Sequence, residues 1–201
     1  MYKYFKNLII CGIIASVLWC ISLLSDKQEL RQGLIRFHVV ANSNNADDQA
    51  IKIKVRDAVF QSIQKDLTTI SDISAAKDYL LENIPKIQKV VNNTLSKSGY
   101  PEWSSVSLCK EYFDVRHYDT FSLPAGIYDS LRIIIGEGNG NNWWCVAFPS
   151  LCIPATAAEF ENAAVGAGFS KAMSKTLSGQ YTIRFYLLDR LGQLENIFYI
   201  E

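Results

Sequence analysis

Apolar and polar side chains alternate in the stretch Leu34-Ile35-Arg36-Phe37-His38-Val39-Val40, which ends in Ala41-Asn42-Ser43. Successive side chains of a β-strand point to opposite faces, so Ile35, Phe37 and Val39 share one face, and Arg36 and His38 share the other. This alternation is typical of a half-buried strand. We therefore expect a strand over 34–40 that opens a folded domain.

A polar cluster over Asn42 to Asn45 separates this strand from a segment with helical periodicity. Short polar side chains accept hydrogen bonds from the free amides of a first helical turn, and Asp47 and Asp48 suit the positive end of the helix dipole. Apolar residues then recur at helical spacing from Ile51 onwards. A helix that begins at the polar cluster is the result we expect.

The rest of the domain reads as helices, strands and helices again. Ser71 is the expected N-cap of a second helical region, which Pro85 divides into two helices or interrupts within one. Strands are predicted over 106–118, 130–135 and 143–148, and helices over 155–162, 170–176 and the C-terminus. The pattern predicts a single α+β domain over 34–201, with a small, mostly antiparallel sheet that helices cover on one face.

The N-terminus predicts export. Lys3 and Lys6 precede a run of 17 residues, Leu8 to Leu24, that contains no charge. A basic start followed by an apolar run is typical of a signal peptide, and the run is also near the shortest length that spans a bilayer. We assign residues 1–25 to a signal peptide or membrane anchor, with membrane contact through residues 8–24 if it is uncleaved, and residues 26–33 to a linker.

Charge and motifs exclude several classes of function. Lysine plus arginine and aspartate plus glutamate number 20 each, so the chain lacks the basic excess typical of nucleic-acid binding. The glycine-rich segment 136–142 fits neither dinucleotide nor phosphate-loop spacing, and we expect it to be a hairpin turn rather than a cofactor site. His38 and His117 belong to no metal-spaced cluster, and no nucleophile elbow occurs. Binding of a partner, without a cofactor or metal, is favoured over catalysis.

Two further features concern the segment 143–152. Cys109, Cys145 and Cys152 are exported, and the turn between the last two permits a Cys145–Cys152 disulfide, with buried free thiols as the alternative. Trp143 and Trp144 should point to opposite faces of a strand, so that one of them is available as an anchor for a partner or packs under the last helices.

Several ordered blocks carry a family resemblance. The first block is Leu34 to Ser43, followed by Asp48-Gln49-Ala50 and Lys52-Ile53-Lys54-Val55-Arg56-Asp57. The second half contains Leu123-Pro124-Ala125-Gly126-Ile127-Tyr128, Leu131 to Gly138, Asn142-Trp143-Trp144-Cys145-Val146 and Phe148-Pro149-Ser150-Leu151-Cys152. The chain resembles the stage II sporulation protein R family in these blocks. Ala147, Ser150 and the tail after Ala155 depart from the expected pattern.

The resemblance implies a signalling protein of endospore-forming bacteria. Such a protein is made in the forespore and exported into the space between the forespore and mother-cell membranes. There it activates a membrane-embedded aspartic protease, which releases sigma-E from its precursor. Polar or anchoring residues near loops of the family blocks are the candidates for partner binding: Asn42, Ser43, Asp48, Gln49, Glu137, Asn142 and Trp143.

Two other functions stay open. The runner-up is a cell-envelope binding module or hydrolase, which the polar loops at 42–45 and 136–142 also suit. A pocket that gathers His38 with carboxylates would favour this reading. The third hypothesis is a purely structural envelope protein, which a strong self-association surface would indicate.

Overall fold

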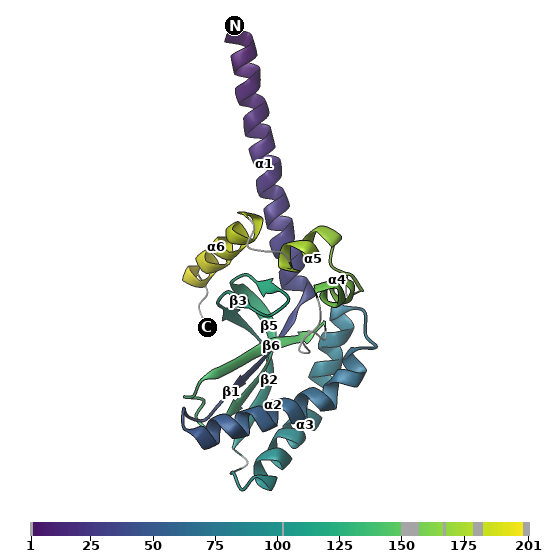
Figure 1. Ribbon diagram of the computed structural model, residues 1–201, viewed down its shortest axis with the longest axis vertical. Helices are drawn as coiled ribbons and strands as arrows, with labels where there is room; N and C mark the ends of the chain where they lie inside the picture. Colours follow the sequence, from purple (N-terminus) through teal and green to yellow (C-terminus); the bar gives the residue numbers. More distant parts are fainter. Residues whose placement is uncertain (1, 102, 150–156, 167, 179–182, 199–201) are drawn as a thin grey trace.

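The computed structural model describes residues 2–101, 103–149, 157–166, 168–178 and 183–198 (Figure 1). The helices are α1 (Tyr2–Gly33), α2 (Ala46–Leu67), α3 (Ile73–Lys97), α4 (Ala157–Gly166), α5 (Lys171–Ser178) and α6 (Ile183–Phe198). The strands are β1 (Ile35–Val40), β2 (Ser104–Phe113), β3 (Arg116–His117), β4 (Ser122–Leu123), β5 (Gly126–Ile135) and β6 (Asn142–Phe148).

Four strands form the main sheet in the order β2-β5-β1-β6, and β3 pairs with β4 in a separate ribbon. β5 runs parallel to β1, whereas the other two pairings, β1 with β6 and β2 with β5, are antiparallel. The predicted small, mostly antiparallel sheet packed against helices, with a hydrophobic helix before it, is confirmed. The three predicted strands of the second half appear as β2, β5 and β6.

Both faces of this sheet are covered. α2 and α3 pack on the face that carries Phe37 and Val39, and form one apolar core with it. The end of α1, α4, α5, α6 and the β3–β4 ribbon cover the other face and form a second apolar core. The expectation that helices cover one face is therefore wrong. β1 alternates as predicted but is buried at every position, because it lies in the middle of the sheet under both layers.

The helix that enters the domain is longer than predicted. α1 continues without a break through residues 26–33, which we expected to be a linker. Leu30 and Leu34 are buried in the second core, so the packing of apolar side chains keeps this segment folded. Among the described residues, Tyr4–Gly33 is the one helix long and apolar enough to cross a membrane, a test that a signal sequence also passes.

The helix starts agree with the polar signals that predict them. Asn45 caps α2, and its side-chain oxygen accepts a hydrogen bond from the amide of Asp48 at 2.6 Å. Asp72 caps α3, one residue after the predicted Ser71. α3 is a single helix with Pro85 inside it, which decides between the two alternatives.

The glycine-rich segment between β5 and β6 is not a hairpin turn. β1 lies between these two strands, so the segment passes over the C-terminal end of β1. Gly136 and Gly138 have φ values of 60° and 68°, which favour glycine. A Cβ atom on Gly140 would lie 2.3 Å from the carbonyl oxygen of Ser43. The glycine and asparagine residues correctly predicted that the chain turns here. They could not predict that β1 lies between the two strands that the turn connects, because strand order depends on the whole chain.

We expect Gly192→Ala to destabilise the domain, because α6 contacts the strand layer through this residue. An added Cβ atom would lie 1.6 Å from the carbonyl oxygen of Ala125. Such overpacking lowers the free energy of unfolding by about 2 to 3 kcal/mol, which denaturant unfolding in detergent would measure. The control is Gly166→Ala, also in a helix, where nothing lies within 4 Å of the new atom. Equal stability of the two variants would contradict the packing of α6 described here.

Candidate functional site

The carboxylate of Asp48 organises the loop at the end of β1. Its Oδ2 atom accepts hydrogen bonds from Asn42 Nδ2 at 2.9 Å, Ser43 Oγ at 2.6 Å and Asn45 Nδ2 at 3.1 Å. The bonds from Ser43 and Asn42 lower the pKa of Asp48 below its ordinary value. A charged carboxylate therefore holds three polar side chains in fixed positions.

Asn42 joins this loop to the segment between β5 and β6. Its side-chain oxygen accepts a hydrogen bond from the amide of Glu137 at 3.0 Å, and its backbone oxygen accepts one from the amide of Asn139 at 3.1 Å. The amide of Gly140 donates to the carbonyl of Ala41 at 2.9 Å. We call the two loops, residues 41–45 and 136–141, together with the first turn of α2, the polar pole.

Lys52 connects α2 to the end of the loop 136–141. Its Nζ atom donates to Gln49 Oε1 at 2.6 Å and to the carbonyl of Asn141 at 2.8 Å. Gln49 in turn donates to the carbonyl of Ser43 at 2.8 Å. Burial lowers the pKa of Lys52. Both loops are therefore tied to α2 by side chains of that helix.

A cleft with a volume of about 390 Å³ opens beside the polar pole. It is lined by Asn42, Ser43, Asp48, Tyr100, Pro101, Trp103, Ile135, Gly136, Glu137 and Asn139. Trp103 is 63% exposed, which is unusual for a side chain of this size, and its backbone oxygen accepts a hydrogen bond from the amide of Gly136 at 2.8 Å. Aromatic and apolar residues thus form one wall, and the amide and carboxylate groups form the other.

The cleft suits a partner with an apolar side chain next to a cation. Glu137 at the rim and Asp47 on the first turn of α2 are exposed carboxylates. Burial and the charges of Asp47 and Asp48 raise the pKa of Tyr100, which keeps its hydroxyl protonated. No group of three or more histidine, cysteine, aspartate or glutamate side chains that could hold a metal occurs among the described residues.

The structure brings together four of the seven predicted binding residues. Asn42, Ser43, Asp48 and Glu137 line the same cleft, although Glu137 is far from the others in the sequence. The remaining three lie outside the lining: Gln49 faces the loop backbone, Asn142 begins β6, and Trp143 packs edge-on against Phe37 at 5.7 Å between ring centroids. Whether any of these residues touches a partner stays a prediction.

Sequence reasoning missed the aromatic wall. Tyr100, Pro101 and Trp103 follow α3, and none of them is among the residues predicted to bind a partner. Trp103 is the one local signal for this wall, because tryptophan is enriched among the residues that dominate binding interfaces.

A second polar cluster lies inside the domain, on the other face of β1. His38 Nδ1 lies 3.1 Å and 3.0 Å from the two carboxylate oxygens of Glu111. Their side chains are 8% and 9% exposed, and Trp144 stacks on the His38 ring at 5.7 Å. The pairing of His38 with a carboxylate is the feature that would favour a hydrolase, but the pair does not line the cleft, and stacking and burial restrict access to it.

Arg36 completes this internal cluster. It is fully buried, donates to the hydroxyl of Tyr118 at 3.0 Å and lies 4.4 Å from the ring centroid of Phe113. Burial lowers its pKa. Burial alone would raise the pKa of Glu111, but the hydrogen bond and charge of His38 outweigh this and lower it. The cluster is therefore a buried polar network in which Glu111 pairs with His38, and Arg36 contacts the Tyr118 hydroxyl and the Phe113 ring.

Of the two cysteines in the predicted disulfide, only Cys145 lies among the described residues. Cys145 lies on β6 and is disulfide-bonded, whereas Cys109 is a free thiol. Cys152 lies outside the described residues, so the Cys145–Cys152 pairing stays a prediction.

Comparison with known proteins places the polar pole inside a matched region. Residues 31–158 match the family model described as stage II sporulation protein R. The chain is also 36% identical over 118 residues to stage II sporulation protein R of Bacillus subtilis (strain 168). This alignment covers 59% of the chain and 53% of the relative, so the chain spans about half the length of the curated relative it matches. No solved structure matches the chain.

Asp48→Asn should destabilise the polar pole. The new amide group would place an N–H donor or an uncharged oxygen where the side chains of Asn42, Ser43 and Asn45 now donate to a carboxylate. We expect a loss of about 2 kcal/mol in the free energy of unfolding at neutral pH. The pKa of Asp48 is lowered, so its stabilisation is present above the ordinary value of 3.8 and disappears as the pH falls through the lower folded value. Denaturant unfolding at several pH values measures the difference, which should shrink in acid.

The matched control for this variant is Asp47→Asn, an exposed neighbour in the same helical turn. It should lower the free energy of unfolding by less than about 1 kcal/mol, the contribution of an exposed carboxylate at a helix N-terminus. A loss in Asp47→Asn equal to that in Asp48→Asn would contradict the role of Asp48 as the centre of the loop.

Glu111→Gln should weaken the internal cluster by about 2 kcal/mol at neutral pH, because a charged hydrogen-bond partner of His38 is removed. The lowered pKa of Glu111 means that its stabilisation is present above 4.5 and lost as the pH falls through the folded value. Unfolding measured from neutral pH down to pH values below that range should show the wild type converging on the variant. The exposed Glu137→Gln is the control, and a pH-independent difference for Glu111→Gln would refute this account.

Proposed function

Because the chain belongs to the stage II sporulation protein R family, we propose that it acts in sporulation as an exported signalling protein that activates a membrane-embedded aspartic protease. Activation of the protease leads to proteolytic release of sigma-E from its precursor. The single observation that carries this proposal is the family match, which includes both loops of the polar pole. The protein supplies binding energy, so it needs no catalytic group of its own.

The positions of α1 and the cleft at the two ends of β1 support the proposal that the protein acts between two membranes. β1 begins at the end of α1 and ends at the polar pole, so the apolar helix and the cleft lie at opposite ends of the domain (Figure 1). A strand of this length spans about 20 Å. If α1 lies in the forespore membrane, the cleft faces away from it, towards the mother-cell membrane in which the protease would lie.

The cleft supports the binding step. A partner shifts the equilibrium of a receptor only through a difference in affinity for its two states. Trp103 offers a large apolar surface, and Glu137 offers a charge beside it. We propose that an extracytoplasmic loop of the protease inserts an apolar residue flanked by a lysine or arginine here, and that this loop is accessible only in the active state.

A second candidate function is favoured by one observation at the same place. An exposed aromatic side chain beside amide and hydroxyl groups, as Trp103 lies beside Asn42 and Ser43, also suits a sugar ring. The protein would then be an envelope glycan-binding module. Sedimentation of the purified protein with cell-wall glycan, compared between wild type and Trp103→Ala, distinguishes this function from protease activation.

The proposal predicts the outcome of an assay in a non-sporulating host that makes the protein, the protease and the sigma-E precursor together. The intact protein should cause precursor cleavage, and a form without residues 1–25 should not, because it is not exported. Trp103→Ala should lower cleavage about tenfold or more, since an anchoring tryptophan contributes 2 kcal/mol or more to binding. Immunoblotting of the precursor measures each result.

Leu81→Ala is the matched control, because Leu81 is 51% exposed on α3 and does not line the cleft. It should leave cleavage unchanged, with equal amounts of each variant outside the cell. Full activity of an exported Trp103→Ala would contradict the use of the cleft. Absence of cleavage with the exported wild type and a matched protease would contradict the activator function itself.

A further inference from the structure

α6 carries an exposed apolar stripe. Its members are Ile183, Tyr186, Leu194 and Ile197, which are between 42% and 75% exposed. Tyr186 and Leu194 are eight residues apart with Arg190 midway between them, and the other steps are of three residues, so all of these residues share one face of the helix. The stripe lies outside residues 31–158, the region that matches the family.

The other side of α6 rests on the domain. Phe185 and Asp189 are buried, and Asp189 accepts a hydrogen bond from the amide of Ala125 at 2.9 Å. Helical spacing places the stripe opposite these residues. The stripe therefore points away from the strand layer, and α6 itself lies at the end of the domain from which α1 leaves (Figure 1).

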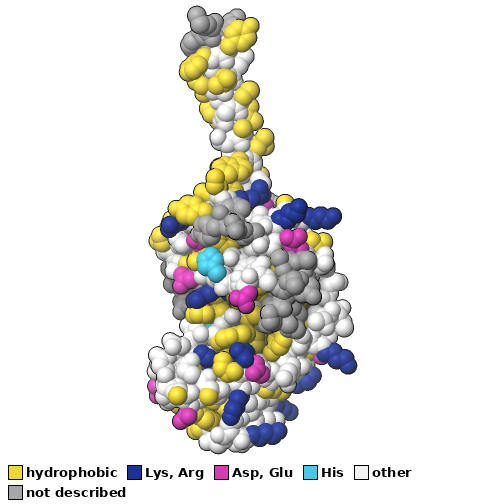
Figure 2. Space-filling view, viewed as in Figure 1, with side chains coloured by type: hydrophobic (Ala, Val, Ile, Leu, Met, Phe, Trp, Pro, Cys, Tyr) yellow, Lys and Arg dark blue, Asp and Glu magenta, His cyan; other side chains and the backbone are white. Residues whose placement is uncertain are grey.

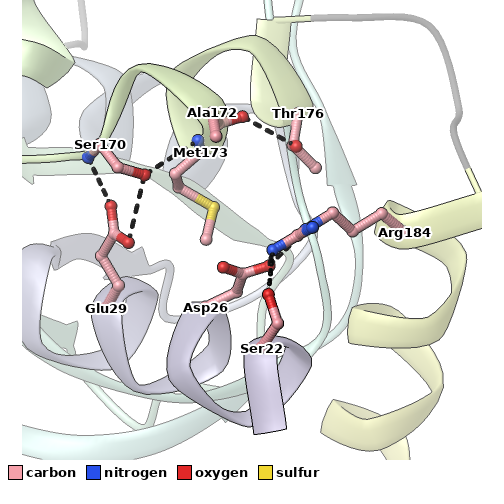
Figure 3. A network of polar contacts seen from close by, with 8 residues as sticks. All are labelled: Ser22, Asp26, Glu29, Ser170, Ala172, Met173, Thr176 and Arg184. Carbon is pink, nitrogen blue, oxygen red and sulfur yellow. Dashed lines mark hydrogen bonds and ion pairs between the residues drawn. The ribbon is translucent and has the colours of Figure 1, made fainter. Parts of the chain in front are cut away.

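Polar contacts fix α6 against the lower part of α1. Arg184 forms an ion pair with Asp26 and donates to Ser22 Oγ at 2.9 Å (Figure 3). Further along, Lys27 forms an ion pair of 2.7 Å with Glu195. The first turn of α6 thus lies level with Ser22 and cannot slide along α1.

α5 holds the same segment of α1 from a second side. The amide of Ser170, just before α5, donates to Glu29 Oε1 at 2.6 Å, and the Ser170 hydroxyl donates to Glu29 Oε2 at 3.3 Å (Figure 3). The relative position of α1 and the domain is therefore determined by two separate sets of contacts.

The length of the apolar run places the bilayer surface close to α6. Leu8 to Leu24 contains 17 residues, which extend about 25 Å as a helix. A hydrocarbon core is about 30 Å thick, so nearly the whole run is needed to cross it, and the boundary would lie near the C-terminal end of the run. Ser22, the partner of Arg184, lies within this run. The first turn of α6, which is level with Ser22, would then lie at the boundary between the hydrocarbon core and the headgroup layer.

From this arrangement we infer that α6 is an interfacial helix, whose apolar stripe inserts into the surface of the membrane that α1 enters. The bilayer is the occupant of the stripe because the apolar surface of α1 continues to the place where α6 begins; Figure 2 shows hydrophobic atoms along α1 and at its junction with the domain. An amphipathic helix with an apolar face and nearby cations is typical of such a position. The inference rests on retention of α1 and not on the identity of the protein partner.

Charge at the base of α1 agrees with this orientation. A cavity of about 540 Å³ beside Leu24 is lined by four cations, Lys27, Arg31, Lys77 and Lys110, and two carboxylates, Asp129 and Glu195. Two of these cations, Lys27 and Arg31, belong to α1 and follow Leu24 by about one and two helical turns. Arg190, which lies 5.0 Å from the ring centroid of Tyr186, adds a cation within the stripe itself.

The test uses the full chain in nanodiscs of phosphatidylcholine and phosphatidylglycerol that contain a phospholipid with a diazirine on its acyl chain. After illumination, mass spectrometry of peptides should find lipid attached to α1 and to α6, and not to the α3 peptide that contains the exposed Leu81. A combined variant, Ile183→Ser with Leu194→Ser and Ile197→Ser, should lower labelling of α6 about fivefold or more, because three apolar side chains no longer favour insertion. Labelling of α1 should stay unchanged.

Leu81→Ser is the matched control, since it also removes an exposed apolar side chain, and it should not alter labelling of α6. The wild-type pattern decides the question even if the combined variant folds poorly. Labelling of α6 at the level of the α3 peptide would overturn the inference. Labelling of α6 that falls to the level of the α3 peptide whenever a nanodisc holds two copies of the chain would overturn it as well, because the stripe would then be covered by a second copy.

Discussion

The position of β1 between β5 and β6 is the constraint on which the rest of the structure depends. Because two strands that follow each other in the sequence lie on opposite sides of β1, their connection must pass over its end. The backbone groups of that connection then need partners, and Asn42 and Ala41 supply them. Asp48 keeps Asn42 in place from the first turn of α2. The cleft is thus a consequence of the strand order.

The same strand also joins the two ends of the molecule. α1 runs into β1 with a single residue between them, so the apolar helix and the polar pole are connected by one short, fully buried element. Arg36 and His38 face the core formed with α4, α5 and α6, and Phe37 and Val39 face the core formed with α2 and α3. A rigid link of this kind suits the proposed function, in which the cleft is presented at a defined distance from a membrane.

Local sequence patterns predicted much of this arrangement, and their failures have a common cause. The alternation around Phe37, the asparagine-rich start of α2 and the strands β2, β5 and β6 are properties of neighbouring residues. Burial of Arg36 was not predictable in the same way, because helices from the other end of the chain cover it. Residues 136–142 have the composition of a tight hairpin turn, which would pair β5 with β6. β6 pairs with β1 instead, because the order of strands depends on the whole sheet.

Photo-crosslinking from the cleft tests the central claim most directly. A photo-crosslinking amino acid would replace Trp103 in the exported protein, and Leu81 in a parallel sample, in cells that also make the protease. The account predicts a covalent product with the protease from position 103 and none from position 81. Products from position 81 alone, or from neither position while the precursor is still cleaved, would show that the polar pole is not where the partner binds.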